Sequence, residues 1–139
     1  MADEWDVIVI GGGPAGLAAA LYTGRAMMRT LVLEKLVVGG QLAEAYDVDN
    51  YLGFDEGILG PELVEKMKKH AERFGAKIVS EEASDITADG SLKTVHTSAG
   101  EHTAPIVVVA SGAYHRKLEV PGEDRLAGAG VSYCATCDG

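Results

Sequence analysis

The chain has 139 residues, of which 47% are hydrophobic and 24% charged, and its formal net charge is −9 at pH 7. This length suits one domain, and the composition is that of a globular protein and not of a disordered one. Only 12 basic residues stand against 21 acidic ones, which argues against a nucleic-acid partner. No apolar run approaches the roughly 18 residues that a membrane helix needs, so we expect no membrane association. The acidic start is unlike a secretory signal, and the cytoplasm is the expected compartment.

The first part of the chain predicts a strand, a glycine turn, a helix and a second strand. Residues 5–10 form a β-branched apolar run that is typical of a buried parallel strand, and residues 30–34 predict another. Between them, Pro14 suits the first turn of a helix, and residues 15–27 carry apolar side chains at helical spacing. This order predicts a βαβ unit.

The rest of the chain predicts loops, one helix and mostly strands. Residues 39–42 and 47–57 indicate irregular, ligand-facing loops, residues 61–73 a helix, and residues 76–79 and 106–110 strands. Residues 84–103 predict two or three antiparallel strands, with hairpin turns at Asp89-Gly90 and Ala99-Gly100. Together these elements predict an α/β, Rossmann-like fold with a parallel sheet and an inserted antiparallel β-meander.

The glycines of the first turn match the pattern G-x-G-x-x-G. Gly11 would allow a tight turn, Gly13 would let a pyrophosphate approach, and Gly16 would allow close helix–strand packing. The free N–H groups and the dipole of the helix would hold the phosphates. Glu34, 18 positions after Gly16 and at the end of the second predicted strand, would bind a ribose 2′-OH and repel a 2′-phosphate. The pattern predicts a dinucleotide site that does not take NADP; the alternatives are a glycine turn without a ligand and a merely solvated Glu34.

The fingerprint alone does not decide between FAD and NAD. A plain NAD-binding unit would continue with βα repeats, whereas residues 84–103 insert a β-meander. The meander therefore favours FAD.

The two cysteines stand three positions apart, in the motif Cys134-Ala135-Thr136-Cys137. Such a pair can close a disulfide, and the motif can lower the pKa of a thiol. Asp138 follows the pair, where it could carry the proton that thiol–disulfide exchange requires or simply be a turn residue. A zinc site would need two more ligands, and the histidines show no paired spacing, so no metal is expected; two inert cysteines remain an alternative. We expect the histidines to be exposed and without a role: His70, His96, His102 and His115.

Several motifs in this order resemble the N-terminal part of the low-molecular-weight, NADPH-dependent thioredoxin reductases. They lie at residues 11–16, 39–42, 48–54, 110–113, 116–118, 120–123 and 134–139, so the resemblance covers essentially the whole chain. It implies an FAD-binding domain over residues 1–115, without its returning segment. Residues 116–139 would be the crossover and the start of an NADPH and dithiol domain. The resemblance also implies a homodimer that reduces a thioredoxin-like protein disulfide.

The same resemblance assigns roles to single residues. The FAD pyrophosphate would lie over the glycine turn, at Gly11, Gly13, Pro14, Ala15 and Gly16, and the adenosine ribose would lie at Glu34. The remaining cofactor contacts would come from Gly40 and Gln41 on the flavin side, Asn50 at the isoalloxazine ring, Ala83 at the adenine, and Ala110 and Gly112 near the phosphates. Cys137 would be the sulfur next to the flavin, Cys134 the sulfur that exchanges with the protein substrate, and Asp138 the acid/base.

The chain departs from the family pattern at three places. Ser111 replaces a common Thr, and Leu52 replaces a common Pro. A second glycine fingerprint, an Arg cluster for the NADPH 2′-phosphate and the returning segment would follow Gly139. Without that segment, the strand at residues 106–110 would be an unpaired sheet edge with uncovered apolar surface.

Several functions fit this pattern. The first is a disulfide reductase that passes electrons from NADPH through FAD to Cys134 and Cys137, and on to thioredoxin. The second is a non-catalytic FAD-binding fragment, or a split subunit completed by another chain. The third is a ferredoxin- or flavin-linked relative, or the flavoprotein of an alkyl hydroperoxide reductase.

Overall fold

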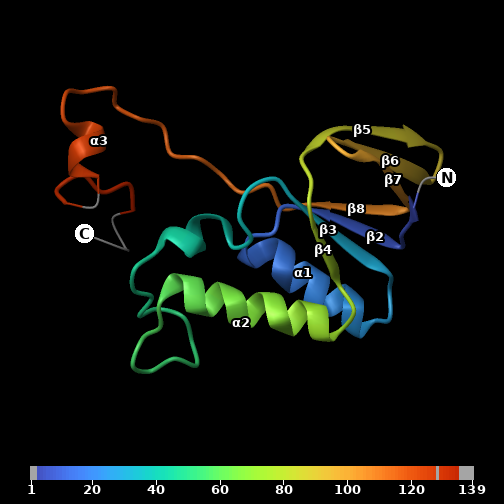
Figure 1. The fold of residues 1–139 in the computed structure, drawn as a ribbon, viewed down its shortest axis with the longest axis horizontal. Coiled ribbons are helices and arrows are strands. Elements are labelled where there is room, and N and C mark those ends of the chain that lie inside the picture. Colours follow the sequence, from blue (N-terminus) through green and yellow to red (C-terminus); the bar gives the residue numbers. More distant parts are fainter. Residues whose placement is uncertain (1–2, 128, 135–139) are drawn as a thin grey trace.

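The computed structural model describes residues 3–127 and 129–134 and contains two four-stranded sheets (Figure 1). The first sheet is parallel, with the strand order β4-β3-β2-β8. Its strands are β2 (Val7–Ile10), β3 (Thr30–Glu34), β4 (Lys77–Ser80) and β8 (Ile106–Val109). In register, Ile10 lies opposite Leu33 and Val109, and Glu34 lies opposite Ser80. The four carboxyl ends therefore meet at one edge, where open α/β sheets bind their ligands.

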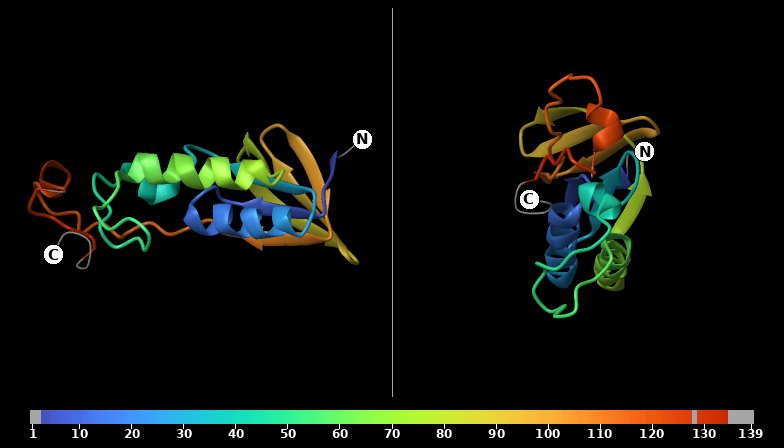
Figure 2. Two further views of the ribbon diagram at one scale, coloured as in Figure 1. Left: turned by 90° about the horizontal axis from the view of Figure 1, so that it is seen from below. Right: turned by 90° about the vertical axis from the view of Figure 1, so that its left-hand side faces the viewer.

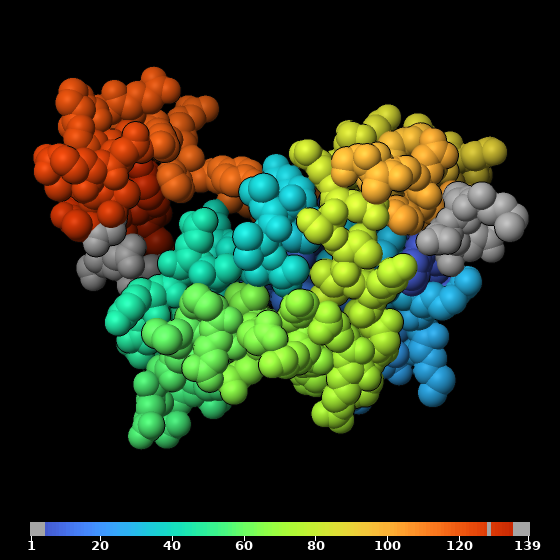
Figure 3. Space-filling view, in the orientation of Figure 1, coloured from blue at the N-terminus to red at the C-terminus, as the bar shows by residue number. Residues whose placement is uncertain are grey.

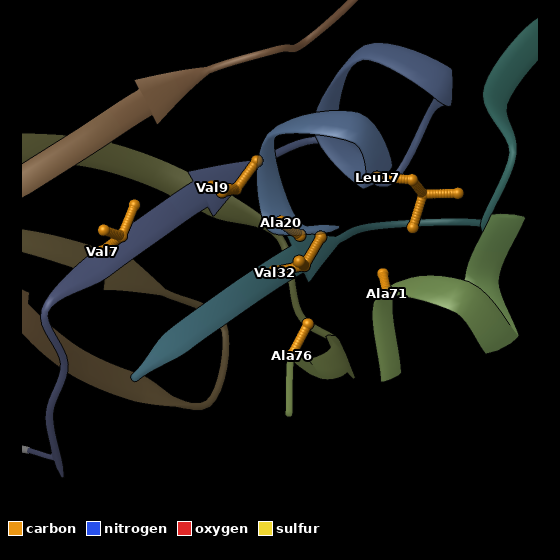
Figure 4. Close-up of a cluster of buried hydrophobic side chains, with 7 residues drawn as sticks. All are labelled: Val7, Val9, Leu17, Ala20, Val32, Ala71 and Ala76. Carbon is orange, nitrogen blue, oxygen red and sulfur yellow. The ribbon is translucent and has the colours of Figure 1, made fainter. Parts of the chain in front are cut away.

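Two helices, α1 (Pro14–Arg25) and α2 (Gly60–Arg73), cover one face of this sheet (Figures 1 and 2). The core between them consists of small and β-branched side chains: Val7, Val9, Leu17, Ala20, Val32, Ala71 and Ala76 (Figure 4). At Gly24 a Cβ would collide with the carbonyl oxygen of Phe74. The small residues of α1 thus allow the two helices to approach closely.

The second sheet covers the other face, so that the domain has three layers. It contains β5 (Ala83–Asp89), β6 (Leu92–Thr97) and β7 (Gly100–Ala104), which form an antiparallel meander, and β1 (Asp3–Glu4), which pairs in parallel with β7. A second core cluster lies between the two sheets: Ile8, Leu31, Leu33, Val95 and Ala104. The predicted α/β architecture with its inserted meander is confirmed.

Two predicted elements and the predicted exposure of one side chain differ from the structure. The predicted strand at residues 5–10 is divided, because the N–H of Trp5 donates to the carbonyl of Thr103 and extends the pairing of β1 with β7. The predicted loop at residues 39–42 enters a 3-10 helix, η1 (Gly40–Glu44). His102 is not solvent-exposed as predicted, because it faces the inter-sheet core and its side chain is only 14% exposed.

His102 belongs to a polar cluster at this inter-sheet boundary. Its Nε2 lies 2.8 Å from Oε2 of Glu81, and the Thr97 hydroxyl donates to the same oxygen at 2.7 Å. These two hydrogen bonds, that of Thr97 first, lower the pKa of Glu81 below its ordinary value, against the opposing effect of burial. Lys77 adds a smaller effect in the same direction.

Because this pKa is lowered on folding, the ionised Glu81 stabilises the fold at neutral pH. That stabilisation is complete above the ordinary pKa of 4.5 and is lost as the pH falls through the lower value of the folded state. We expect Glu81→Gln to reduce the free energy of unfolding at pH 7, with a smaller difference from wild type at about pH 3. Urea unfolding at both pH values measures this difference. The exposed Glu56→Gln is the control, and a Glu81→Gln difference that is as large in acid as at neutral pH would contradict the assignment.

After β8 the chain leaves the sheet in an extended crossover, residues 110–116, and enters a small C-terminal lobe, residues 117–127 and 129–134. The lobe contains the short helix α3 (Glu123–Leu126) and a bridge between Ala127 and Val131. In Figures 1 and 3 it lies at one end of the molecule, joined to the rest by the crossover. Among the described strands β8 is an edge of the parallel sheet, and its Val109 is 65% exposed, as the sequence predicts. In the described part of the chain, no helix has the length and apolarity to cross a membrane.

Candidate dinucleotide site and cysteine motif

The glycine turn between β2 and α1 contains three glycines of the predicted pattern, Gly11, Gly13 and Gly16. Gly11 has a φ of +105°, and a Cβ there would collide with the carbonyl oxygen of Ala110. A Cβ at Gly16 would collide with the carbonyl oxygen of Gly11. At Gly13, in contrast, no heavy atom of the described residues beyond its chain neighbours lies within 4 Å of the position that a Cβ would take. Two glycines therefore serve packing, while the third leaves open space beside the helix.

The N-terminus of α1 has the features of an anion site. Gly13 is its N-cap and makes no side-chain capping bond, Pro14 begins the helix, and the first turn carries no acidic side chain. Among the described residues, no side chain caps the N–H groups of Ala15 and Gly16, and the helix dipole adds positive potential there. The open space at Gly13 together with this uncapped helix end fits the pyrophosphate of a dinucleotide.

Glu34 ends β3 directly beside the glycine turn. Its Oε2 accepts a hydrogen bond from the N–H of Gly12 at 2.7 Å, and its Oε1 accepts one from the N–H of Leu36 at 2.9 Å. Each carboxylate oxygen has a second lone pair, so the group can still accept from a ribose hydroxyl. Glu34 also lines a recess of about 210 Å³ beside β4 and α2, with Ser80 and Lys68 among its neighbours.

Two further segments meet the glycine turn. The N–H of Gly39 donates to the carbonyl of Gly12 at 2.8 Å, and a Cβ at Gly40 would lie 3.7 Å from Cα of Gly13. Gln41 Nε2 donates to the carbonyl of Ala113 in the crossover at 2.5 Å. Contacts of the structure thus bring the predicted Gly40, Gln41 and Ala110 together with the glycine turn, and Gly112 follows in the same crossover with a φ of +72°.

Two other predicted residues lie apart from this group. Ala83 begins β5 and lines an open recess of about 360 Å³ with Ile10 and Val109, at the carboxyl edge of the sheet. Asn50 lies exposed on a loop that is closed by the bridge between Val48 and Ile58. Among the described residues, no hydrogen bond joins Asn50 to the glycine turn.

The cysteine motif lies in the C-terminal lobe. Cys134 is disulfide-bonded, and its N–H donates to Oγ of Ser132 at 3.1 Å. Cys137 and Asp138 lie outside the described residues. The lobe lies on the side of the carboxyl edge of the sheet, and the extended crossover separates it from that edge (Figure 1).

The sequence interpretation did not assign a role to Glu123 and Tyr133. Glu123 is 4% exposed, and its Oε1 accepts from the Tyr133 hydroxyl at 2.5 Å. The sequence offers one signal for this pair, an acidic residue directly after a glycine. In the structure this glycine, Gly122, has a left-handed φ of 93° and is the N-cap of α3. The carboxylate thereby joins two parts of the lobe that are ten positions apart.

A model of the pyridine nucleotide-disulphide oxidoreductase family matches residues 5–139. The thioredoxin reductase of Streptomyces coelicolor is 50% identical over 141 residues, which cover 100% of this chain and 44% of that protein. The thioredoxin reductase of Bacillus subtilis is 49% identical over 135 residues, which cover 97% of this chain and 42% of that protein.

Solved structures agree with this result. Thioredoxin reductase from Streptococcus pyogenes superimposes with a TM-score of 0.90 at 39% identity, over 99% of this chain and 45% of that one. A ferredoxin-flavin thioredoxin reductase from Clostridium acetobutylicum gives a TM-score of 0.74 at 37% identity, over 99% of this chain and 48% of that one. The chain spans less than half the length of these relatives. The predicted resemblance to thioredoxin reductases is confirmed, and with a family match from residue 5 to residue 139, the chain belongs to the pyridine nucleotide-disulphide oxidoreductases.

Proposed function

We propose that this chain forms the FAD-binding part and the dithiol motif of a thioredoxin reductase-type flavoprotein. The observation that carries the proposal is the convergence of the glycine turn, Glu34, Gln41 and the crossover at the carboxyl edge of one parallel sheet. The open space at Gly13 is the part of this group that a bound phosphate would use. The proposed division is an FAD-binding domain over residues 1–115 and the start of a dithiol domain over residues 116–139.

The residues of the convergent group would each do a separate task. The N–H groups of Ala15 and Gly16 would bind the pyrophosphate, and Glu34 would orient the adenosine ribose. Gly40 and Gln41 would lie beside the flavin, with Asn50 at its ring, while Ala83 and Ala110 would close the adenine and phosphate regions. Bound FAD would supply the two-electron chemistry between a nicotinamide donor and a disulfide. The negative charge of Glu34 supports FAD over NADP at this site.

The cysteine pair would carry the electrons to the protein substrate. The Cys134 thiolate would attack one sulfur of a thioredoxin-like disulfide and form a mixed disulfide, with the other substrate sulfur leaving as a thiolate. Cys137 would then attack Cys134, which closes the Cys134–Cys137 disulfide and releases the second substrate sulfur. Asp138 would transfer protons to the two substrate thiolates that leave, so that two electrons and two protons pass to the substrate.

A second electron donor is a specific alternative. One similar structure is named as a ferredoxin-flavin thioredoxin reductase, and the residues described here do not include a nicotinamide site. We propose NADPH as the donor because the similar proteins from Streptomyces coelicolor, Bacillus subtilis and Streptococcus pyogenes are named as thioredoxin reductases, without mention of ferredoxin. A homodimer in the cytoplasm is proposed from the same resemblance.

The test uses protein expressed from the whole reading frame that encodes this chain. Under anaerobic conditions, NADPH is expected to bleach the flavin band near about 450 nm, and added oxidised thioredoxin is expected to restore it. Reduced ferredoxin in place of NADPH is the parallel arm. Bleaching by ferredoxin alone would change the donor, and recolouring that thioredoxin does not accelerate would contradict the proposed substrate.

A further inference from the structure

The C-terminal lobe is built around a single buried carboxylate. Glu123 is 4% exposed and is the one buried residue among the described residues of the lobe. Its Oε1 accepts from the N–H of Leu118 at 2.9 Å, and its Oε2 accepts from the N–H of Glu119 at 2.7 Å. The Tyr133 hydroxyl donates to Oε1 at 2.5 Å. A buried charge is tolerated when donors surround it in this way.

Two of these hydrogen bonds stabilise an unfavourable backbone conformation at Glu119. Glu119 has a φ of +59°, in the left-handed region that side chains other than glycine, Asn and Asp rarely adopt. Its N–H and that of Leu118 both point to the Glu123 carboxylate. The carboxylate therefore determines the course of the chain directly after the crossover.

The third donor connects this point to the cysteine motif. Tyr133 stacks its ring on His115 of the crossover, with the ring centroids 3.6 Å apart and the planes 18° apart. The neighbouring Glu123 carboxylate raises the pKa of Tyr133 to about 12, and the Tyr133 hydroxyl is the first cause of a lowered pKa at Glu123. A neutral phenol thus donates to an ionised carboxylate throughout the neutral range.

Cys134 follows Tyr133 directly, and its own backbone is held by Ser132. The Ser132 hydroxyl accepts from the N–H of Cys134 and lies 3.1 Å from its carbonyl oxygen. The chain before the reactive sulfur is therefore held at Tyr133 and at Ser132. The contact through Tyr133 reaches the crossover at His115, and Gln41 joins the crossover at Ala113 to the dinucleotide site.

We propose that Glu123 is a positioning residue, which acts through Tyr133 to hold Cys134 in place relative to the crossover. The inference rests on the proposed role of Cys134 in disulfide exchange and names a residue that serves it. Thiol–disulfide exchange requires an approach of the attacking sulfur along the substrate S–S bond, so a loosened Cys134 reacts more slowly without losing affinity for the substrate.

The test compares Tyr133→Phe with Asp124→Asn in protein expressed from the whole reading frame. Tyr133→Phe removes only the hydroxyl and keeps the ring on His115. Asp124→Asn is the matched control, because it breaks the ion pair with Lys117 in the same lobe but keeps the hydrogen bonds of Glu123 with Leu118, Glu119 and Tyr133. We expect Tyr133→Phe to lower kcat for thioredoxin about tenfold, with KM within about twofold. Glu123→Gln is expected to lower it at least as much, since its NH2 group replaces one of the two oxygens and cannot accept from the N–H of Leu118 or Glu119.

A second measurement does not depend on turnover. We expect the equilibrium constant for forming the cysteine disulfide against glutathione to fall about fivefold in Tyr133→Phe and not in Asp124→Asn, since ordering of Cys134 favours ring closure. If the wild-type protein fails to reduce thioredoxin, the proposed function fails while the glutathione equilibrium still tests the positioning role. A Tyr133→Phe protein whose kcat and glutathione equilibrium both match those of Asp124→Asn would overturn the inference, whatever its thermal stability.

Discussion

Replacing Gly16 with alanine is expected to prevent stable folding of the FAD-binding domain. The added Cβ would collide with the carbonyl oxygen of Gly11, and that atom belongs to the backbone of the turn itself. Gly11 cannot move away easily, because its N–H donates to the carbonyl of Leu33 at 2.8 Å and its own Cα approaches Ala110. Overlap with backbone that is held in place costs about 3 kcal/mol or more, a large part of the stability of a typical domain.

Gly13→Ala is the control for this prediction, because it adds the same methyl group three positions away. No heavy atom lies within 4 Å of that Cβ, and the φ of −73° suits alanine. We expect the free energy of unfolding to change by less than about 0.5 kcal/mol, while FAD affinity falls about tenfold or more because the methyl group occupies the space for the pyrophosphate. Urea unfolding and a titration of flavin fluorescence measure the two effects. Wild-type FAD affinity in Gly13→Ala would contradict the placement of the phosphates.

Replacing Cys134 with serine is expected to lower thioredoxin reduction by a factor of about a thousand or more. A serine hydroxyl remains protonated near neutral pH and forms no disulfide, so neither attack on the substrate nor ring closure with Cys137 can occur. Reduction of the flavin by NADPH is expected to continue at the wild-type rate, because that step precedes the cysteine pair. Anaerobic stopped-flow absorbance measures the flavin step, and NADPH consumption with thioredoxin measures the whole reaction.

The two cysteines can be distinguished by trapping. With Cys137→Ser, the remaining Cys134 is expected to form a stable mixed disulfide with oxidised thioredoxin, visible on a non-reducing gel. With Cys134→Ser, no such product is expected. The opposite pattern, in which only Cys134→Ser traps thioredoxin, would show that the roles of the two sulfurs are reversed.

The glycine turn could be predicted from the sequence because its constraints are local. The spacing of Gly11, Gly13 and Gly16, followed by an acidic residue at the end of the next strand, depends on one strand, one turn and one helix. The structure adds that Glu34 accepts a hydrogen bond from the N–H of Gly12. The hairpin turns at Asp89-Gly90 and Ala99-Gly100 also predicted the antiparallel meander.

Contacts between distant segments were beyond sequence reasoning. Gln41 and Ala113 are 72 positions apart, and only the packing of η1 against the crossover brings them together. His102 was expected in solvent because its sequence neighbours are polar. Which face it takes depends on the strand register, and a shift of one residue reverses the face. Glu123 was overlooked because an acidic side chain in a glycine- and proline-containing segment usually faces water.

The amount and identity of bound flavin test the central claim most directly. The protein, expressed from its whole reading frame and purified without added cofactor, is denatured with acid, and the released nucleotide is separated and quantified. The account predicts FAD at about one molecule per polypeptide, held at the carboxyl edge of the parallel sheet. A folded protein that releases no flavin, or that releases NAD in place of FAD, would contradict it.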